Sequence, residues 1–145
     1  MSVTVAKTAG FCFGVRRAVE LAEEQAHEHG SIYAYGEIIH NMHEIERLEK
    51  MGVHTAHTIE EIPDGERVLI RAHGVPRAVY DAFRAKNCEI FDATCPFVHK
   101  IHRIVDEESR AGRLIVILGK EGHPEVEGIR GWCGESVVID GEQAA

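Results

Sequence analysis

The sequence lacks several features that would assign it to a common class of protein. Its four cysteines include no Cys-x-x-Cys pair, so the short ligand spacing of a zinc knuckle is absent. The longest purely apolar run, Leu114 to Leu118, is too short to cross a membrane, and the N-terminus has no signal-peptide pattern. We therefore expect a cytoplasmic protein, in which buried, catalytic or metal-bound cysteines are more common than disulfides.

Positive charge and aromatic side chains are also scarce. The formal net charge is −8 and no lysine-rich tract occurs, which argues against a nucleic-acid-binding protein. Any anionic ligand would therefore have to be held by a local cluster of groups. Aromatic residues make up 6% of the chain and hydrophobic residues 44%, so we expect a core of Val, Ile, Leu and Ala. The 145 residues suffice for one compact domain or two small ones.

Short apolar runs alternate with amphipathic stretches along the chain. The runs typical of strands are 3–6, 31–35, 67–72, 88–93, 113–119 and 136–140. Helices are predicted from Val15 to Gly30, from a cap at Asn41 to Met51, after 73–74, from Pro96 to Gly112, and after 123–124. In the helix from Pro96, the spacing predicts that these side chains point inward: Phe97, Ile101, Ile104 and Val105.

This alternation predicts an α/β fold with parallel sheets flanked by helices. A strand, a cysteine loop and a helix occur at Cys12 and again at Cys95. The repeat indicates a complete αβα unit over residues 1–95 and a second, truncated unit over residues 96–145. Because the sequence stops soon after one more strand, we expect a fragment or one part of a split protein.

Thiols and imidazoles follow the predicted strands. They are Cys12, His40, His73, Cys95 and His123. The carboxyl ends of parallel strands lie at one edge of a sheet, so we expect these side chains to converge there. Helix N-termini hold phosphates and favour the thiolate form of cysteine. Thiolates in turn suit zinc or iron–sulfur clusters.

Other polar residues have plainer interpretations. We expect Cys88 and Cys133 to be structural and Asp92 to cap or brace its turn. The pair Arg16–Arg17 lies in the first turn of a helix, where cations are disfavoured, which indicates an anion nearby. For His102 the sequence leaves the choice open. Histidines expected to be solvated are His27, His29, His43, His54, His57 and His99.

Five ordered motifs resemble 4-hydroxy-3-methylbut-2-enyl diphosphate reductase, the last enzyme of the methylerythritol phosphate route to isoprenoids. They are GFCFGVRRAV, IIHN, RAHGVP, FDATCPFVHKIH and GHPEVEG. The resemblance runs from Gly10 to about Ile139 and corresponds to the N-terminal half of that family. It implies three pseudo-symmetric α/β units around a 4Fe-4S cluster, each unit giving one cysteine. Cys12 and Cys95 match two of these ligands.

The resemblance also implies roles for the residues around the cluster. The diphosphate-binding histidines of the family correspond to His40, His73 and His123, and the acid that helps to deliver protons corresponds to Glu125. The implied reaction is the reductive dehydroxylation of an allylic diphosphate to isopentenyl and dimethylallyl diphosphate. The implied electron donor is reduced ferredoxin or flavodoxin.

The sequence departs from the family in having no third unit. A third cluster cysteine is therefore missing, and Cys88 and Cys133 do not occupy its place. We expect the chain to be inactive alone, with a longer parent or a second polypeptide supplying the remainder. Two other interpretations stay open. One is a zinc-binding hydrolase or module using Cys12, Cys95 and two of the histidines. The other is a non-catalytic α/β domain that binds a phosphorylated metabolite.

Overall fold

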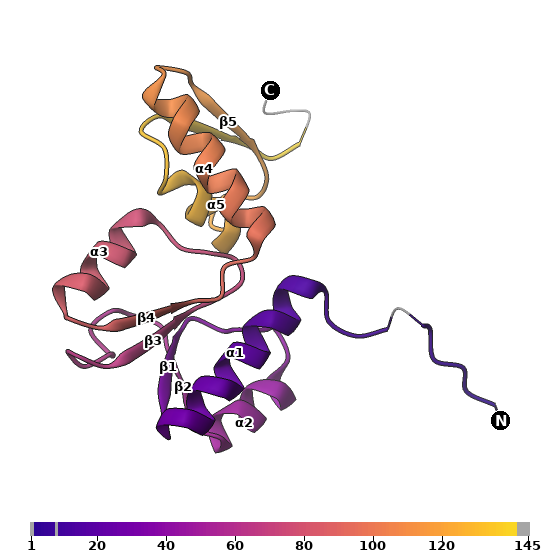
Figure 1. Ribbon diagram of the computed structural model, residues 1–145. Helices are drawn as coiled ribbons and strands as arrows, with labels where there is room; N and C mark the ends of the chain where they lie inside the picture. The colour runs from indigo at the N-terminus through magenta and orange to yellow at the C-terminus, as the bar shows by residue number, and fades with distance from the viewer. Residues whose placement is uncertain (1, 8, 142–145) are drawn as a thin grey trace.

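The structure is a computed structural model that describes residues 2–7 and 9–141, and it contains two parallel sheets flanked by helices (Figure 1). The predicted α/β class is confirmed. In chain order the elements are α1 (Phe13–His29), β1 (Ile32–Tyr35), α2 (Met42–Lys50), β2 (Val53–Ala56), β3 (Arg67–Ile70), α3 (Arg77–Ala85), β4 (Glu89–Asp92), α4 (Pro96–Arg110), β5 (Ile115–Leu118), α5 (Pro124–Arg130) and β6 (Ser136–Ile139).

The first sheet has the strand order β2-β1-β3-β4, and all neighbours are parallel. Ala34 in β1 is paired with Thr55 on one side and Leu69 on the other. From β1 the chain moves through α2 to one edge, and from β3 it moves through α3 to the other. The order therefore reverses between β1 and β3. Open α/β sheets bind their ligands outside the carboxyl ends of the strands at such a switch point.

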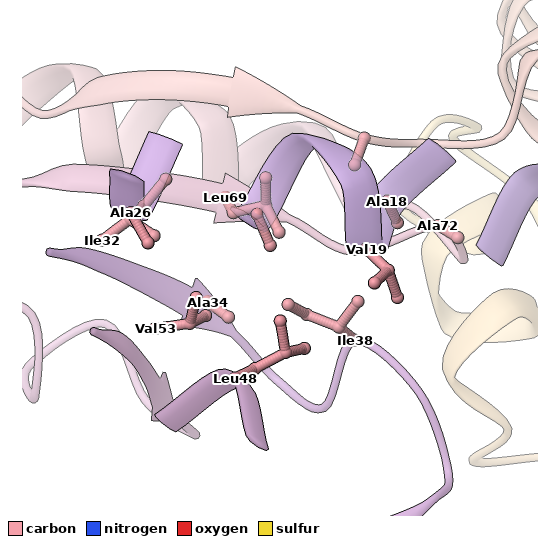
Figure 2. Packing of buried hydrophobic residues seen from close by; sticks show 12 residues of the cluster. Ala18, Val19, Ala26, Ile32, Ala34, Ile38, Leu48, Val53, Leu69 and Ala72 are labelled. Carbon is pink, nitrogen blue, oxygen red and sulfur yellow. The ribbon is translucent and has the colours of Figure 1, made fainter. Parts of the chain in front are cut away.

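Helices cover both faces of this sheet, with α1 and α2 on one side and α3 on the other (Figure 1). Leu69 points into the layer under α1 and α2 (Figure 2), whereas Val68 and Ile70 pack with Phe83 of α3. This alternation is the period-two pattern of a strand buried on both sides. The sheet-facing side of α1 consists of small residues, such as Ala18 and Ala22, which let the helix approach closely.

The second sheet contains only β5 and β6, paired in parallel. Its core is small: Ile117 packs with Val105 of α4 and with Val126 and Ile129 of α5. None of the helices in residues 2–7 and 9–141 has the length and hydropathy of a membrane span.

Trp132 joins the second sheet to the first. Its indole N–H donates to the carbonyl oxygen of Val75 at 2.9 Å, and its ring stacks on His102 with centroids 5.2 Å apart. His102, which the sequence left undecided, is a buried packing residue. Gly74 leaves room for it, because a Cβ there would lie 2.6 Å from the His102 ring. The division into units at residue 95 stays a prediction.

The first predicted strand is wrong. Residues 3–6 form no strand and pair with no other described segment, and Val3 and Val5 are 88% and 74% exposed. An apolar run forms a β-strand only where a neighbouring strand pairs with it, and this segment leads away from the sheet (Figure 1). Cys12 therefore follows no strand, and α1 begins at Phe13, two residues earlier than predicted. Strand β2 was not predicted at all.

The predicted inward face of α4 is also wrong, apart from Val105. Phe97, Ile101 and Ile104 are 72%, 38% and 43% exposed. The buried residues of α4 are Val98, His102 and Val105, because this side faces α5 and Trp132.

Candidate functional site

A crevice of about 400 Å³ lies at the switch point between β1 and β3. Three of the predicted site residues line it, namely Cys12, His40 and His73. Cys12 precedes α1, His40 follows β1, and His73 follows β3. Three segments that are distant in sequence therefore meet where a sheet of this order binds its ligand.

The three predicted diphosphate-binding histidines form a row. The ring centroids of His40 and His73 are 5.7 Å apart, and those of His73 and His123 are 6.4 Å apart. His123 caps the start of α5, where its Nδ1 accepts a hydrogen bond from the backbone N–H of Glu125 at 3.3 Å. The row therefore extends from the crevice to the start of α5, and His73 is its middle member.

His73 is half-buried, and its Nδ1 is buried without a hydrogen-bond partner among the described residues. Burial lowers the pKa of His73, and the positive groups Arg71 and His40 lower it further. Glu125 acts in the opposite direction, and His123 adds to the lowering. Burial and these charges therefore favour the neutral form of the ring in the free chain. An anion in the crevice would favour the protonated ring.

Arg71 belongs to the same cluster and was missed in the sequence. It directly follows β3, and its guanidinium crosses Gly36, where a Cβ would lie 2.3 Å from Nη1. Gly36 has φ +76°, so both the backbone and the close crossing require glycine. Burial lowers the pKa of Arg71, and its Nε has no partner among the described residues. The available signal was its place at a strand end, two residues before His73.

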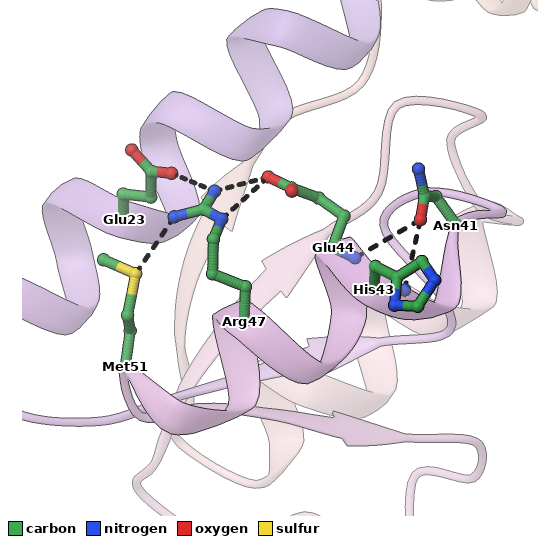
Figure 3. A network of polar contacts seen from close by, with 6 residues as sticks. All are labelled: Glu23, Asn41, His43, Glu44, Arg47 and Met51. Atoms are coloured by element: carbon green, nitrogen blue, oxygen red, sulfur yellow. Dashed lines mark hydrogen bonds and ion pairs between the residues drawn. The ribbon is translucent and has the colours of Figure 1, made fainter.

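The capped start of α2, which Figure 3 shows, follows His40 directly in the chain. Asn41 is the cap predicted from the sequence. Its Oδ1 accepts hydrogen bonds from the backbone N–H groups of His43 at 3.1 Å and Glu44 at 3.4 Å. His40 is exposed, and its Nδ1 lies 3.1 Å from Oε2 of Glu37. The cap fixes the backbone beside the crevice, and Glu37 orients the ring.

Cys12 and Cys95 take equivalent places at the starts of α1 and α4. Each is the capping residue, with extended backbone and no capping hydrogen bond from its side chain. Cys12 is exposed, whereas Cys95 is half-buried against Gly14, where a Cβ would lie 2.9 Å from Sγ. Gly14 is two residues from Cys12. The second thiol therefore reaches the first turn of the helix that the first thiol begins, although Cys95 does not line the crevice.

Two thiols match an iron–sulfur cluster in the kind of ligand but not in number. Among the described residues, no three or more His, Cys, Asp or Glu side chains are grouped so that they could hold a metal ion. A cluster held by this chain alone therefore does not fit. The thiols of Cys12 and Cys95 are suited by their chemistry to contribute to such a ligand set, and their role as ligands stays a prediction.

Arg17 lies between the two cysteine segments. Its Nη1 donates to the carbonyl oxygen of Thr94 at 3.2 Å and its Nη2 to that of Asp92 at 3.3 Å. These carbonyls lie at the end of β4 just before Cys95, so α1 holds the segment that carries the second thiol. Among the described residues the partners of Arg17 are carbonyl oxygens, and the anion expected beside Arg16–Arg17 stays a prediction.

Asp92 braces the same turn, as the sequence suggested. Its Oδ1 accepts from the backbone N–H of Thr94 at 2.8 Å, and its Oδ2 accepts from the hydroxyl of Tyr80 at 2.8 Å. Nε2 of His99 lies 3.2 Å from Oδ2. His99 is exposed, as expected, and also contacts this carboxylate.

Cys88 and Cys133 have packing roles. The Sγ of Cys88 is 3.7 Å from the carbonyl oxygen of Pro63, and that of Cys133 is 3.5 Å from the carbonyl oxygen of Arg130. Each packs against a hydrophobic cluster, as expected of structural cysteines.

Glu125 lies beside the crevice, not in it. Together with His123 it lines a neighbouring hollow of about 350 Å³ between the end of β5 and the start of α5. Its effect on the pKa of His73 shows that the carboxylate is electrostatically coupled to the histidine row.

Comparison with known proteins finds diphosphate reductases among the relatives of this chain. The chain is 44% identical over 140 residues to the 4-hydroxy-3-methylbut-2-enyl diphosphate reductase of Clostridioides difficile, covering 96% of this chain and 50% of the relative. It is 41% identical over 145 residues to the enzyme of the same name from Aquifex aeolicus, covering 97% and 50%. The chain thus spans about half the length of these curated relatives.

Solved structures that resemble this chain carry the same enzyme name as these relatives. A structure of (E)-4-hydroxy-3-methyl-but-2-enyl diphosphate reductase matches with a TM-score of 0.84 and 40% identity, covering 97% of this chain and 52% of that one. The structure of the reductase from Plasmodium falciparum matches with a TM-score of 0.87 and 30% identity, covering 92% and 43%. The sequence model of the LytB protein family matches residues 3–145. The chain therefore belongs to the LytB protein family.

Proposed function

We propose that this chain is the part of a 4-hydroxy-3-methylbut-2-enyl diphosphate reductase that binds the diphosphate and supplies two cluster thiolates. The observation that carries the proposal is the row of three histidines at the switch point. Its middle member, His73, has a buried ring nitrogen without a partner among the described residues. The names of the relatives support the choice of substrate.

The diphosphate binds along the histidine row. His40, His73 and His123 donate ring N–H groups to its oxygens, and Arg71 adds a permanent positive charge beside His73. Hydrogen bonds between charged partners are the stronger ones, so the protonated form of His73 is favoured once the anion is bound. Fixing the diphosphate in this way places the hydroxyl end of the substrate for reaction.

The reaction breaks a C–O bond. The allylic skeleton accepts two electrons and one proton, and the hydroxyl group takes a second proton and leaves as water. Glu125 is the residue of this chain that supplies a proton, because it lines the same hollow as His123 at the end of the row. A neighbouring diphosphate favours the protonated form of a carboxyl group, which suits a proton donor.

Cys12 and Cys95 serve as two ligands of a 4Fe-4S cluster, which supplies the electrons of the reduction when it is bound. Arg17 keeps the segment before Cys95 against α1, and Gly14 lets the thiol approach. The remaining ligand comes from the part of the family that this chain does not match, on the same polypeptide or on a second one. Reduced ferredoxin or flavodoxin is the proposed electron donor.

Anaerobic reconstitution tests this proposal. The chain is purified with the complementary half of the Clostridioides difficile relative, iron and inorganic sulfide are measured, and turnover of the allylic diphosphate is followed with a chemical reductant. The Cys12→Ser and Cys95→Ser variants should lose iron and turnover. Their matched controls, Cys88→Ser and Cys133→Ser, should keep both.

Two results would contradict the proposal. Iron retention that is insensitive to Cys12→Ser and Cys95→Ser would exclude these thiols as ligands, and zinc in place of iron would favour the zinc-binding interpretation. Diphosphate binding that survives without any cluster or turnover in the reconstituted protein would favour a non-catalytic binding domain.

A further inference from the structure

His73 lies in a tight turn, residues 71–75, which we call the His73 turn. Gly74 has φ +70°, and its N–H donates to the carbonyl oxygen of Arg71 at 3.0 Å. The backbone N–H of Cys95 donates to another carbonyl oxygen of the turn at 2.9 Å, so the turn is tied to the segment after β4. Backbone hydrogen bonds therefore hold the His73 turn on the side of the first sheet.

Helix α5 contacts the other side of the His73 turn. Gly128 lies close to it, because a Cβ there would be 3.4 Å from the carbonyl oxygen of His73 and 3.5 Å from that of Gly74. Gly131 lies against Pro76, where a Cβ would be 2.5 Å from the Cα of the proline. The φ of Gly131 is −69°, which any residue can adopt, so the close approach of the chain is what requires glycine there.

Trp132 and His102 complete the contacts with the turn. The indole N–H of Trp132 donates to the carbonyl oxygen of Val75 at 2.9 Å, and its ring stacks on His102 with 18° between the planes. The His102 ring in turn lies so close to Gly74 that a Cβ there would be 2.6 Å from it. Each of the three residues 73–75 is therefore in contact with a different group from α4, α5 or the residue after them.

His102 acts through its shape. It is 1% exposed, and both of its ring nitrogens lack a hydrogen-bond partner among the described residues. Burying a polar ring without such partners is costly, so this side chain contributes by packing between the turn and the indole. The guanidinium of Arg77 lies over the same indole, 4.8 Å from its centroid, and pairs with Asp106 of α4. The position of Trp132, and with it the hydrogen bond to the turn, is thus set by α4.

We propose that Trp132 and His102 are positioning residues for His73, which hold its turn so that the ring takes the middle place in the histidine row. The inference rests on the proposed function, in which His73 binds the diphosphate. Neither Trp132 nor His102 lines the crevice, so each acts through the turn. Side chains that bind a ligand keep their geometry only when the residues behind them are fixed by packing.

The same contacts set the distance between two members of the row. His123 begins α5, and its ring centroid lies 6.4 Å from that of His73. Because α5 also contacts the His73 turn through Gly128, the turn and the start of α5 keep one fixed relation. If the contacts of Trp132 are lost, only a fraction of the chains has the row ready, and the apparent affinity for the anion falls by that fraction.

Two readouts on isotope-labelled chain test the proposal: the NMR signals of the His73 turn without ligand, and the dissociation constant for inorganic pyrophosphate. Trp132→Phe keeps a ring on His102 but removes the N–H donor, and it should weaken binding by about threefold. Trp132→Leu also removes the stack and should weaken binding by about tenfold. In the free Trp132→Leu chain, the ring signal of His73 should shift or broaden, and the amide hydrogen of Gly74 should exchange faster.

A conservative variant and a matched control separate positioning from general stability. His102→Ala should behave like Trp132→Leu, whereas His102→Phe keeps the stack and should bind pyrophosphate within about twofold of the wild-type chain. Val105→Ala is the control, because Val105 lies one turn further along α4 and is buried in the small core of the second sheet. It should lower the stability measured by urea unfolding but leave the His73 signal, the Gly74 exchange and pyrophosphate binding unchanged.

The proposal is overturned if Trp132→Leu leaves the His73 signal and the Gly74 exchange as in the wild-type chain, or if Val105→Ala changes them equally. A wild-type chain that does not bind pyrophosphate would contradict the diphosphate site of the proposed function. The ligand-free signals would still decide whether the His73 turn depends on Trp132. Circular dichroism checks folding, and Trp132→Phe, the mildest change, carries the comparison where the leucine variant is unfolded.

Discussion

The two sheets of the molecule differ in how completely they bury their apolar side chains. In β3, Val68, Leu69 and Ile70 are fully buried, because helices cover both faces of the four-stranded sheet. In β5, Ile117 is buried but Leu118 is 81% exposed, because one face of the two-stranded sheet has no cover among the described residues. Both strands have apolar sequences, so composition alone does not distinguish them.

The difference shows which half of the site has a rigid support. The crevice with Cys12, His40 and His73 lies on the well-covered sheet. His123 and Glu125 come from the start of α5, beside the small second core. The histidine row therefore spans a well-packed part and a sparsely packed part, and its geometry depends on the junction between them.

The largest expected effect comes from making the same substitution in both sheets. Leu69→Ala should lower the free energy of unfolding by about 2–5 kcal/mol, because it removes a fully buried side chain and leaves a cavity. Leu118→Ala should change it by no more than about 0.5 kcal/mol, because that side chain is already in water. Urea unfolding measures both. Equal losses would show that the two sheets do not differ as described.

The junction should make stability depend on pH through His102. Burial, and to a smaller extent the neighbouring His99, lower the pKa of His102 to about 4, although Asp92 acts in the opposite direction. An unfolded histidine titrates near 6.5, so as the pH falls the unfolded chain binds this proton first. The contribution is complete above about pH 6.5 and is lost toward pH 4, with a magnitude of the order of 3 kcal/mol.

His102→Phe keeps the stack on Trp132 and should remove this part of the pH dependence. His27→Phe, at an exposed position on α1, is the control and should leave it unchanged. The measurement is the free energy of unfolding of both variants in urea at pH 7 and at pH 4.5. An identical pH dependence in both would show that His102 does not control the junction.

A smaller effect is expected where α1 meets the segment before Cys95. Arg17→Met should cost about 1–2 kcal/mol, because two carbonyl oxygens lose a charged donor. It should also speed the alkylation of Cys95, assigned by mass spectrometry, because the segment that carries the thiol is no longer held. Arg16→Met, on the exposed neighbour, should change neither quantity. Unchanged alkylation in Arg17→Met would contradict this account.

The smallest effect on the free energy of unfolding is expected at the surface where α1 and α2 meet. Arg47 of α2 contacts Glu23 of α1 and Glu44, and these contacts raise the pKa of Arg47 (Figure 3). All three side chains reach water, so Arg47→Met should cost less than about 1 kcal/mol and less still at high salt. A loss as large as that of Leu69→Ala would mean that charge, and not burial, accounts for the difference in stability between the two sheets.

Much of the fold could be predicted because its signals are local. Asn41 is a strong cap, Pro96 and Pro124 suit a first helical turn, and the strand runs are apolar. The prediction of a strand at residues 3–6 failed because an extended apolar run becomes a strand only if another strand pairs with it. The prediction of the inward face of α4 failed because the helix has two apolar stripes and tertiary packing selects one of them.

The candidate site shows the same limit. Its thiols and imidazoles stand at strand ends or helix starts, so the sequence could indicate them. Only Cys12, His40 and His73 line the crevice, whereas Cys95 does not. Arg71 was missed, because its role depends on its passage over Gly36, which no local pattern reveals. The carbonyl partners of Arg17 could not be predicted either, because they lie 75 and 77 residues away in the sequence.

The most direct test of the central claim is an NMR titration of the histidine rings with inorganic pyrophosphate, using isotope-labelled chain. In the free chain the pKa of His73 should lie below the ordinary value of about 6.5, and saturating pyrophosphate should raise it above that value. The ring signals of His40 and His123 should shift in the same titration, whereas that of His27 should not. A pKa of His73 that is unaffected by pyrophosphate would contradict the assignment of the histidine row as the diphosphate site.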